Sequence, residues 1–318
     1  MKVTALLLGI LAAADGNTLA QRTPPPVTAI AVAPDKSAVI TGSQAGLVEW
    51  SWPALERRRE LSTQFAHIHD LAFSPDGQTL GVAGGTPAES GGVEFWSWPA
   101  GTLARRWNGP QDVVYAIDWD AAGGQVAAAS MDGTVSLLDA ASGTLHRQLV
   151  GHSRAVLAAA YLPGTQGLVT AGADESLRLW NLPAGTVIRT LANHTRSVHD
   201  LAVRPGATAG PAVLASAGDD RTVRLWQPVI GRLMRFARLN SAPRSLGWTP
   251  DGRSLVVACR DGHLLVVDPD SVEVRHSDVA IPAGIFALAV VSDTEVAVGG
   301  PGGIIRRIEI PRWDSVNP

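Results

Sequence analysis

Residues 151–191 read GHSRAVLAAAYLPGTQGLVTAGADESLRLWNLPAGTVIRTL, in which short apolar runs alternate with turn residues. Three of the runs span residues 167–171, 177–180 and 186–191, and a fourth begins at Val156. Runs this short, bounded by Gly, Pro, Asn and Asp, are typical of strands joined by hairpins. The segment therefore predicts four antiparallel strands in one small sheet.

An apolar anchor followed by the same pattern recurs seven times along the chain. The anchors are Val27, Ile68, Val114, Val156, Val198, Pro243 and Ile285. Their separations of 41, 46, 42, 42, 45 and 42 residues match the length of a four-stranded antiparallel blade with short turns. We therefore expect an all-β fold, a seven-bladed β-propeller of four-stranded antiparallel blades formed by residues 15–318 as one domain.

Several short marks recur in phase with the anchors. A Gly-His or Asn-His pair occurs at 151–152 and 193–194, an Asp-x-Thr or Asp-x-Ser turn at Asp132, Asp174 and Asp220, and a Trp near the end of the third strand at Trp50, Trp96, Trp180 and Trp226. With these marks the chain resembles the WD-repeat β-propeller family over nearly all of residues 15–310. Since propellers of this family mostly present one flat face to partners, the resemblance implies a binding role.

The resemblance also implies a buried hydrogen-bond chain in two blades. It would join Trp180, Thr170, His152 and Asp174 in the fourth blade, and Trp226, Ser216, His194 and Asp220 in the fifth. A Ser-His-Asp set is also what a hydrolase uses as nucleophile, base and orienting carboxylate. Because the set recurs in adjacent repeats and ends on a Trp donor, we interpret it as structural, tying a loop to a turn.

The seventh repeat lacks a good fourth strand of its own. After Ile285, residues 302–310 supply a third strand, and the tail 311–318 has a proline at each end, which disfavours a strand. The segment 16–22 lies ahead of the first anchor, where a fourth strand stands in the other repeats. We therefore expect this N-terminal strand to complete the last blade and close the ring.

The first residues, 1–14, have the character of a signal peptide. Lys2 precedes an apolar stretch, and Ala14 and Ala20 are both small enough for a cleavage site. Cleavage after Ala14 would spare the closing strand and leave a mature N-terminus at Asp15. We expect an exported protein, periplasmic or secreted, with a cytoplasmic location as the alternative. The apolar stretch is too short for stable membrane insertion.

Composition bears on the class of function. The formal net charge of −3 offers no global positive field, so we expect no nucleic-acid partner. Cys259 is the only cysteine and stands in an apolar run, which indicates a buried structural thiol. We expect no cofactor, no metal and a monomeric propeller. The alternative is a metal-assisted hydrolase or lactonase-like enzyme, because His67 and His69 occupy alternate strand positions and could share an ion.

The residue after each anchor is expected at the upper rim of its innermost strand. These residues are Thr28, His69, Tyr115, Leu157, His199, Arg244 and Phe286. Three residues before turn aspartates, Met131, Asp219 and Arg260, are expected on the same face, as is Glu89 in an insertion over 84–92. Aromatic and Arg side chains are enriched where partners anchor. The sequence therefore predicts a non-catalytic scaffold that binds a protein or peptide on this face, the top face.

Overall fold

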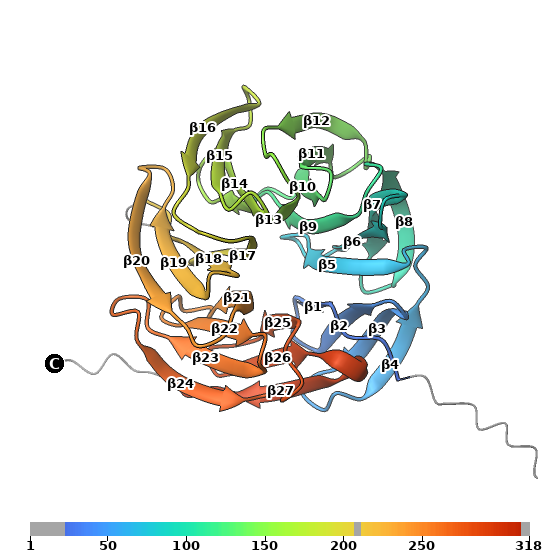
Figure 1. The fold of residues 1–318 in the computed structure, drawn as a ribbon. Helices are drawn as coiled ribbons and strands as arrows, with labels where there is room; N and C mark the ends of the chain where they lie inside the picture. Colours follow the sequence, from blue (N-terminus) through green and yellow to red (C-terminus); the bar gives the residue numbers. More distant parts are fainter. Residues whose placement is uncertain (1–22, 207–210, 313–318) are drawn as a thin grey trace, which may run out of the picture.

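The computed structural model describes residues 23–206 and 211–312, which form a disc of seven antiparallel sheets around a central channel (Figure 1). Each sheet is one blade, whose first strand lines the channel and whose last strand lies at the outside (Figure 1). Six blades have four strands hydrogen-bonded in chain order, and the described part of blade seven has three. The predicted all-β, seven-bladed propeller is confirmed.

The blades follow one another along the chain. Blades one and two comprise β1 (Ala29–Val32), β2 (Ala38–Ser43), β3 (Gly46–Ser51), β4 (Arg57–Leu61), β5 (His67–Phe73), β6 (Thr79–Thr86), β7 (Ser90–Ser97) and β8 (Thr102–Asn108). Blades three and four comprise β9 (Val114–Trp119), β10 (Gln125–Ser130), β11 (Thr134–Asp139), β12 (Leu145–Val150), β13 (Val156–Leu162), β14 (Gly167–Gly172), β15 (Leu177–Asn181) and β16 (Thr186–Leu191). Blades five and six comprise β17 (Val198–Val203), β18 (Leu214–Gly218), β19 (Thr222–Gln227), β20 (Arg232–Arg238), β21 (Pro243–Trp248), β22 (Leu255–Cys259), β23 (His263–Val267) and β24 (Val274–Val279). Blade seven comprises β25 (Ala287–Val290), β26 (Glu295–Gly299), the single turn η1 (Pro301–Gly303) and β27 (Ile305–Glu309).

Burial falls from the inner strands of a blade to the outermost one. In blade four, every residue of β14 is buried, whereas most of β16 is exposed. Both faces of an inner strand pack against neighbouring blades, so its residues are small and apolar on both sides. An outer strand is more exposed to solvent and carries more polar residues. The predicted runs 167–171, 177–180 and 186–191 correspond to β14, β15 and β16.

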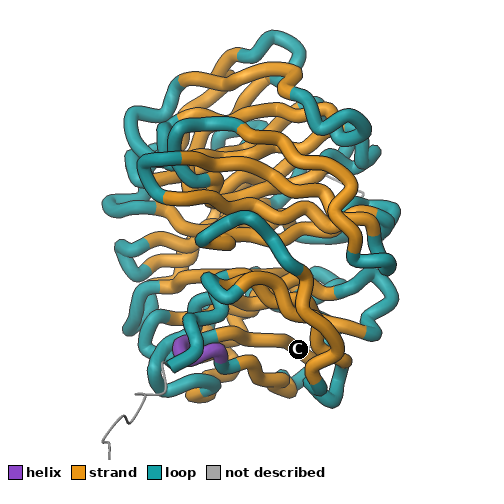
Figure 2. The backbone as a smooth tube through the Cα atoms, turned by 90° about the vertical axis from the view of Figure 1, so that its right-hand side faces the viewer, coloured by secondary structure: helices purple, strands orange, loops and turns teal. Residues whose placement is uncertain are grey.

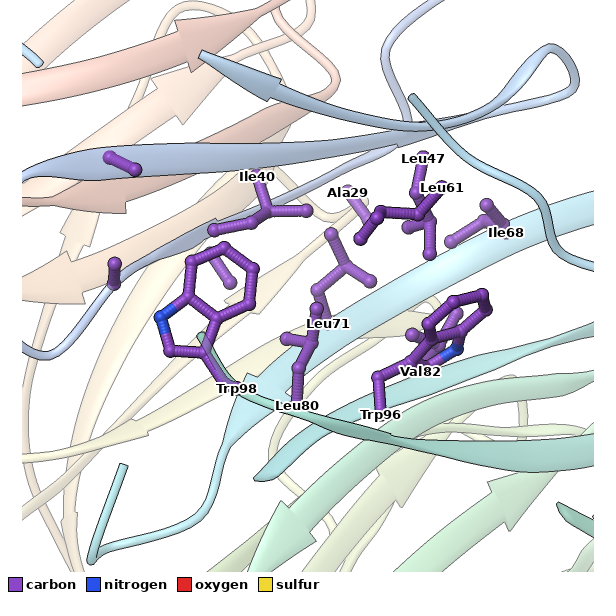
Figure 3. Packing of buried hydrophobic residues seen from close by; sticks show 13 residues of the cluster. Ala29, Ile40, Leu47, Leu61, Ile68, Leu71, Leu80, Val82, Trp96 and Trp98 are labelled. Atoms are coloured by element: carbon purple, nitrogen blue, oxygen red, sulfur yellow. The ribbon is translucent and has the colours of Figure 1, made fainter. Parts of the chain in front are cut away.

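The hydrophobic core lies between blades. Seven clusters of buried residues each join two consecutive blades, and one of them joins blade seven to blade one through Val27, Val39 and Ala297. Figure 3 shows the cluster between blades one and two, where Ile40 faces Leu71. Apolar burial stabilises the fold by about 25 cal/mol for each Å². The ring therefore has a core that is continuous around the disc.

The top face carries the loops that precede the innermost strands and the turns between second and third strands. Seen from the side, the strands fill the thickness of the disc and the loops lie on its two faces (Figure 2). Within 23–206 and 211–312, no helix has both the length and the apolar character needed to cross a membrane. Cys259 is buried and free, as the prediction of a structural thiol required.

Two expectations concern residues 1–22. The export signal 1–14 and the closing strand 16–22 both lie outside the described residues. Within the described chain, β27 pairs with β26 on one side and with no strand on the other.

Candidate functional site

The rim residues of blades two to six each occupy a β-bulge. In blade two, Ile68 pairs with Gly84 and Asp70 with Ala83, so His69 is an extra residue without a partner on β6. The extra residues of the other innermost strands are Tyr115, Leu157, His199 and Arg244. A bulge re-aims the side chain of the extra residue and bends the strand. The same local irregularity is thus repeated around the top of the channel.

The predicted rim residues lie together, five of them in these bulges. A pocket of about 130 Å³ at the upper mouth of the channel is lined by all seven of them: Thr28, His69, Tyr115, Leu157, His199, Arg244 and Phe286. We call this pocket the channel mouth. The volume is that of about four waters or one short side chain.

Polar contacts link two neighbouring blades at the channel mouth. Nε2 of His199 lies 2.7 Å from Oδ2 of Asp219, a residue before a turn aspartate that was expected on this face. The Arg244 guanidinium lies 3.3 Å from Nε2 and 3.5 Å from Nδ1 of the same imidazole, long distances for hydrogen bonds. The Asp219 carboxylate therefore has His199 as its partner, whereas Arg244 makes only weak contacts with this histidine.

Aromatic rings form another side of the channel mouth. The His69 and Tyr115 rings are 4.5 Å apart between centroids, and the His67 ring stacks beyond His69 at 6.2 Å. Burial, then the nearby His67, lowers the pKa of His69 to about 4, so this imidazole is neutral near pH 7. Nε2 of His69 is buried without a hydrogen-bond partner in the described chain.

The remaining predicted residues do not line this pocket. Met131 is exposed in the β10–β11 turn, and Arg260 is exposed in the β22–β23 turn. Glu89 is exposed at the tip of the β6–β7 hairpin. The insertion around Glu89 extends both strands, with Thr86 paired to Ser90, because the added residues continue the hydrogen-bond ladder.

The hydrogen-bond chain expected in blade four is present. Nε1 of Trp180 donates to Oγ1 of Thr170 over 2.8 Å, and this hydroxyl lies 2.7 Å from Nε2 of His152. Nδ1 of His152 lies 2.9 Å from Oδ2 of Asp174. A carboxylate only accepts, so Nδ1–H donates to Asp174 and Nε2 accepts from Thr170.

Electrostatics fix the charges of this pair. Burial lowers the pKa of His152, which keeps the imidazole neutral. Burial alone would raise the pKa of Asp174, but the hydrogen bonds from His152, from the Ser176 hydroxyl and from the Ser153 N–H outweigh it and hold that pKa below its ordinary value. The pair is therefore a neutral imidazole held by an ionised carboxylate.

Blade five repeats the same chain with Ser216 in place of the threonine. Trp226 Nε1 donates to Ser216 Oγ over 2.8 Å, this hydroxyl lies 2.7 Å from His194 Nε2, and His194 Nδ1 lies 2.9 Å from Asp220 Oδ2. Ser216 is 0% exposed and its oxygen already accepts from Trp226. A nucleophile needs access to substrate, so this geometry favours the structural interpretation over the hydrolase one.

Blade one keeps the hydrogen bond from Trp to Thr, and blade two replaces its acceptor with a carboxylate. In blade one, Trp50 Nε1 donates to Thr41 Oγ1 over 2.9 Å. In blade two, Trp96 Nε1 donates to Glu94 Oε2 over 3.0 Å, and Nε of Arg106 donates to Oε1 of the same carboxylate over 3.1 Å. Sequence reasoning missed this buried ion pair, because Glu94 and Arg106 occupy none of the positions of the repeated marks.

Three aspartates on innermost strands join neighbouring blades, and sequence reasoning missed this role too. In each, Oδ2 accepts a backbone N–H from the next blade: Asp70 from Ile117 over 2.9 Å, Asp118 from Tyr161 over 2.7 Å, and Asp200 from Leu246 over 2.8 Å. Burial raises the pKa of Asp70 to about 6 and the pKa of Asp118 and of Asp200 to about 7. The repeated His-Asp pairs at 69–70 and 199–200 were the signal available for two of them.

Below the mouth, these aspartates line a larger part of the channel, with a volume of about 930 Å³. Their oxygens are directed at backbone N–H groups. In residues 23–206 and 211–312, no three His, Cys, Asp or Glu side chains are grouped as a metal ion requires. His67, one of the two histidines expected to share an ion in the enzyme alternative, instead contacts Nε2 of Gln44 through Nδ1 at 3.1 Å.

Three segments of the chain match the family described as WD domain, G-beta repeat, at residues 101–139, 143–181 and 185–227. Each match begins at the outermost strand of one blade and ends on the third strand of the next. The repeat of the sequence is therefore offset by one strand from the blade of the structure, so consecutive repeats interlock.

Curated relatives share shorter segments. The chain is 38% identical over 56 residues to WD repeat-containing protein AAC3 of Dictyostelium discoideum, which is 18% of this chain and 12% of that protein. It is 37% identical over 73 residues to Coronin-7 of Rattus norvegicus, 23% of this chain and 8% of the relative. It is 30% identical over 94 residues to the Periodic tryptophan protein 2 homolog of Caenorhabditis elegans, 30% of this chain and 10% of the relative. The matched segments thus span about a tenth of the relatives' lengths.

Proposed function

Because this chain is a seven-bladed β-propeller of the WD-repeat type, we propose that it is a non-catalytic scaffold that holds a protein partner on its top face. The fold supports such a role, since a rigid disc presents its loops and turns on a broad surface. The formal charge of −3 favours a protein over a nucleic acid as the partner.

The convergence of the rim residues on the channel mouth carries this proposal. Residues that only pack one blade against the next are small and apolar, such as Ala116 and Ala158 one position below the rim. The rim itself holds the larger side chains of Tyr115, Arg244 and Phe286 around one pocket. Aromatic and Arg side chains in a partly buried pocket are the residues that most often dominate binding energy.

The combined change Tyr115→Ala, Arg244→Ala and Arg260→Ala should abolish capture of the native partner while leaving the fold intact. The measurement is a quantitative affinity pull-down from the native host, comparing the partners retained by the original protein and by the variant. The matched control replaces Arg57, Arg58 and Arg59 with Ala on outer strand β4, and this variant should retain the partner. Capture that survives the triple change in a cooperatively melting protein would contradict a top-face site.

A further inference from the structure

Arg244 is a cation at the channel mouth without a carboxylate of its own. In the described chain, the guanidinium has no carboxylate within ion-pair distance, and its contacts are the two long approaches to His199. The carboxylate of Asp219, on the same face, is already paired with that histidine at 2.7 Å. A partly buried guanidinium gains most from a carboxylate, which accepts two of its N–H groups side by side.

Other donors face the same pocket. Tyr115 stands on blade three and Arg244 on blade six, across the channel, and the charge of Arg244 reaches far enough to lower the pKa of Tyr115. Burial, the larger effect, raises that pKa, so the phenol stays protonated and can donate. No hydrogen bond to the Tyr115 hydroxyl exists among the residues that the structure describes, and Nε2 of His69 beside it is also unpaired.

The walls and the size of the pocket limit what can enter. Phe286 is 38% exposed and Leu157 is apolar, so the pocket offers apolar surface beside its donors. Its volume of about 130 Å³ accommodates one short side chain rather than a folded element. A ligand with a small charged end on a short carbon stem satisfies both conditions.

Asp70 and Asp200 lie deeper in the pocket and are the argument for a cation instead. Their carboxylates are already used: Asp70 accepts the N–H groups of Leu71 and Ile117, and Asp200 accepts the N–H of Leu246 together with two further donors. Burial also raises the pKa of Asp200 to about 7, which weakens its negative charge near neutral pH. Arg244 therefore dominates the electrostatics at the mouth.

We infer that the channel mouth receives the side chain of an Asp or Glu from the protein partner, with Arg244 as its counter-ion and the Tyr115 hydroxyl as a second donor. This inference rests on the proposed function and adds the chemistry of the partner to it. The carbon stem of the acidic residue would lie against Phe286, and the following partner residues would pass over the rim of the top face.

A random peptide library, displayed on phage and selected on the full-length protein, tests the inference. We expect one position in the selected sequences to be enriched in Asp or Glu. In synthetic peptides with amidated C-termini, Asp→Asn or Glu→Gln at that position should weaken binding about tenfold, the size expected for a charge-assisted hydrogen-bond pair. Arg244→Gln should remove this difference, whereas the outer-strand control Arg57→Gln should keep it.

Two further variants guard against a loss of folding. Arg244→Lys keeps the charge and should keep the acidic preference, and Arg244→Glu should select Lys- or Arg-containing peptides instead. Selected peptides without an acidic requirement, a basic preference in the original protein, or an acidic preference that Arg244→Gln leaves unchanged would each overturn the inference alone. A library from which the original protein retains nothing above background would overturn the proposed function as well.

Discussion

At the scale of single residues, His152 and His194 show how this chain buries polar side chains. Each imidazole uses both ring nitrogens, one toward an aspartate and one toward a hydroxyl that a Trp also contacts. No atom of either set is left without a partner, which avoids the cost of burying an unpaired polar group. The repetition of the set in adjacent blades indicates that it contributes to stability in both.

Asp174→Asn should lower the free energy of unfolding by roughly 1–3 kcal/mol, because a charged buried acceptor is lost. The carboxylate accepts hydrogen bonds from His152, from the Ser153 N–H and from the Ser176 hydroxyl. An amide would turn an NH₂ group toward one of these donors. Asp220→Asn should act in the same way in blade five, and chemical denaturation of the purified variants measures both effects.

Asp132→Asn provides the matched control. Asp132 begins the equivalent turn in blade three, but it is exposed and caps only Thr134. Its substitution should cost clearly less than that of Asp174. Equal effects at the two positions, or an unchanged stability for Asp174→Asn, would show that the buried network is not what stabilises blade four.

At the scale of strands, the rim positions could be predicted and the bulges could not. Counting one residue from each buried anchor was enough to find His69 and Arg244 on the same rim. A pattern of alternating apolar and polar residues only a few residues long does not reveal the extra residue of a bulge. The direction of its side chain is therefore seen only in the structure. The bulge explains why unlike residues at equivalent positions of blades two to six reach one pocket.

The links between neighbouring innermost strands were harder to predict. Asp70 and Asp200 follow the bulged residue directly, but blade three has Ala116 at that position and makes its link from Asp118, two residues further on. A role that moves along the strand from blade to blade produces no column of identical residues. The ion pair of Glu94 with Arg106 was also hard to predict, because the two residues lie on different strands.

Asp118→Asn should change how stability depends on pH. Burial raises the pKa of Asp118 from 3.8 to about 7, so the folded state holds a proton that the unfolded state has released between these values. The stability from this group is fully present below pH 3.8 and is lost as the pH rises to about 7. Asn cannot ionise. As the pH rises, the free energy of unfolding of the variant should therefore increase relative to that of the original protein, by up to about 1.4 kcal/mol for each unit of that shift.

Unfolding free energies of the two proteins between pH 5 and pH 8 test this expectation. Depressed pKa values of His152 and His194 also make stability pH-dependent, but they act in both proteins and cancel in the difference. The exposed Asp76 has a lowered pKa through its hydrogen bond with Ser74, so the difference for Asp76→Asn should stay flat above pH 5. A flat difference for Asp118→Asn would mean that its carboxylate is ionised throughout.

At the scale of the whole molecule, the regular spacing of the repeats predicted the fold better than any single sequence motif did. The family model matches only three segments, within residues 101–227, yet all seven blades are formed. The regular spacing of apolar anchors predicted the number of blades because each blade must bury its faces against two neighbours. The chain also contains two Trp-Asp pairs, at 119–120 and 313–314, which are out of phase with the apolar anchors. Trp119 lies on the innermost strand β9.

Strand β27 is the outermost strand of blade seven in the part of the chain that the structure describes. Ile305 and Ile308 on this strand are partly buried, and no strand among the described residues pairs with its outer edge. Pro24 lies beside Gly303, at the top of blade seven, where an added Cβ would stand 3.0 Å from the Cβ of the proline. The proposed closing strand, segment 16–22, lies outside the described residues, so its pairing with β27 stays a prediction.

Deletion of residues 1–22 should therefore lower the melting temperature by several degrees and promote self-association through the open edge, whereas deletion of residues 1–14 should do neither. The shorter deletion removes the proposed export signal and keeps the proposed closing strand, so it is the matched control. A closing strand supplies backbone hydrogen bonds along β27 and covers its apolar side chains, and a loss of about 1 kcal/mol corresponds to a shift of about 2–4 °C in a domain of 150–250 residues. Thermal unfolding and size-exclusion chromatography of both deletions measure the two effects. If the two deletions melt at the same temperature and remain equally monodisperse, blade seven does not depend on segment 16–22, and the ring is held by its hydrophobic core alone.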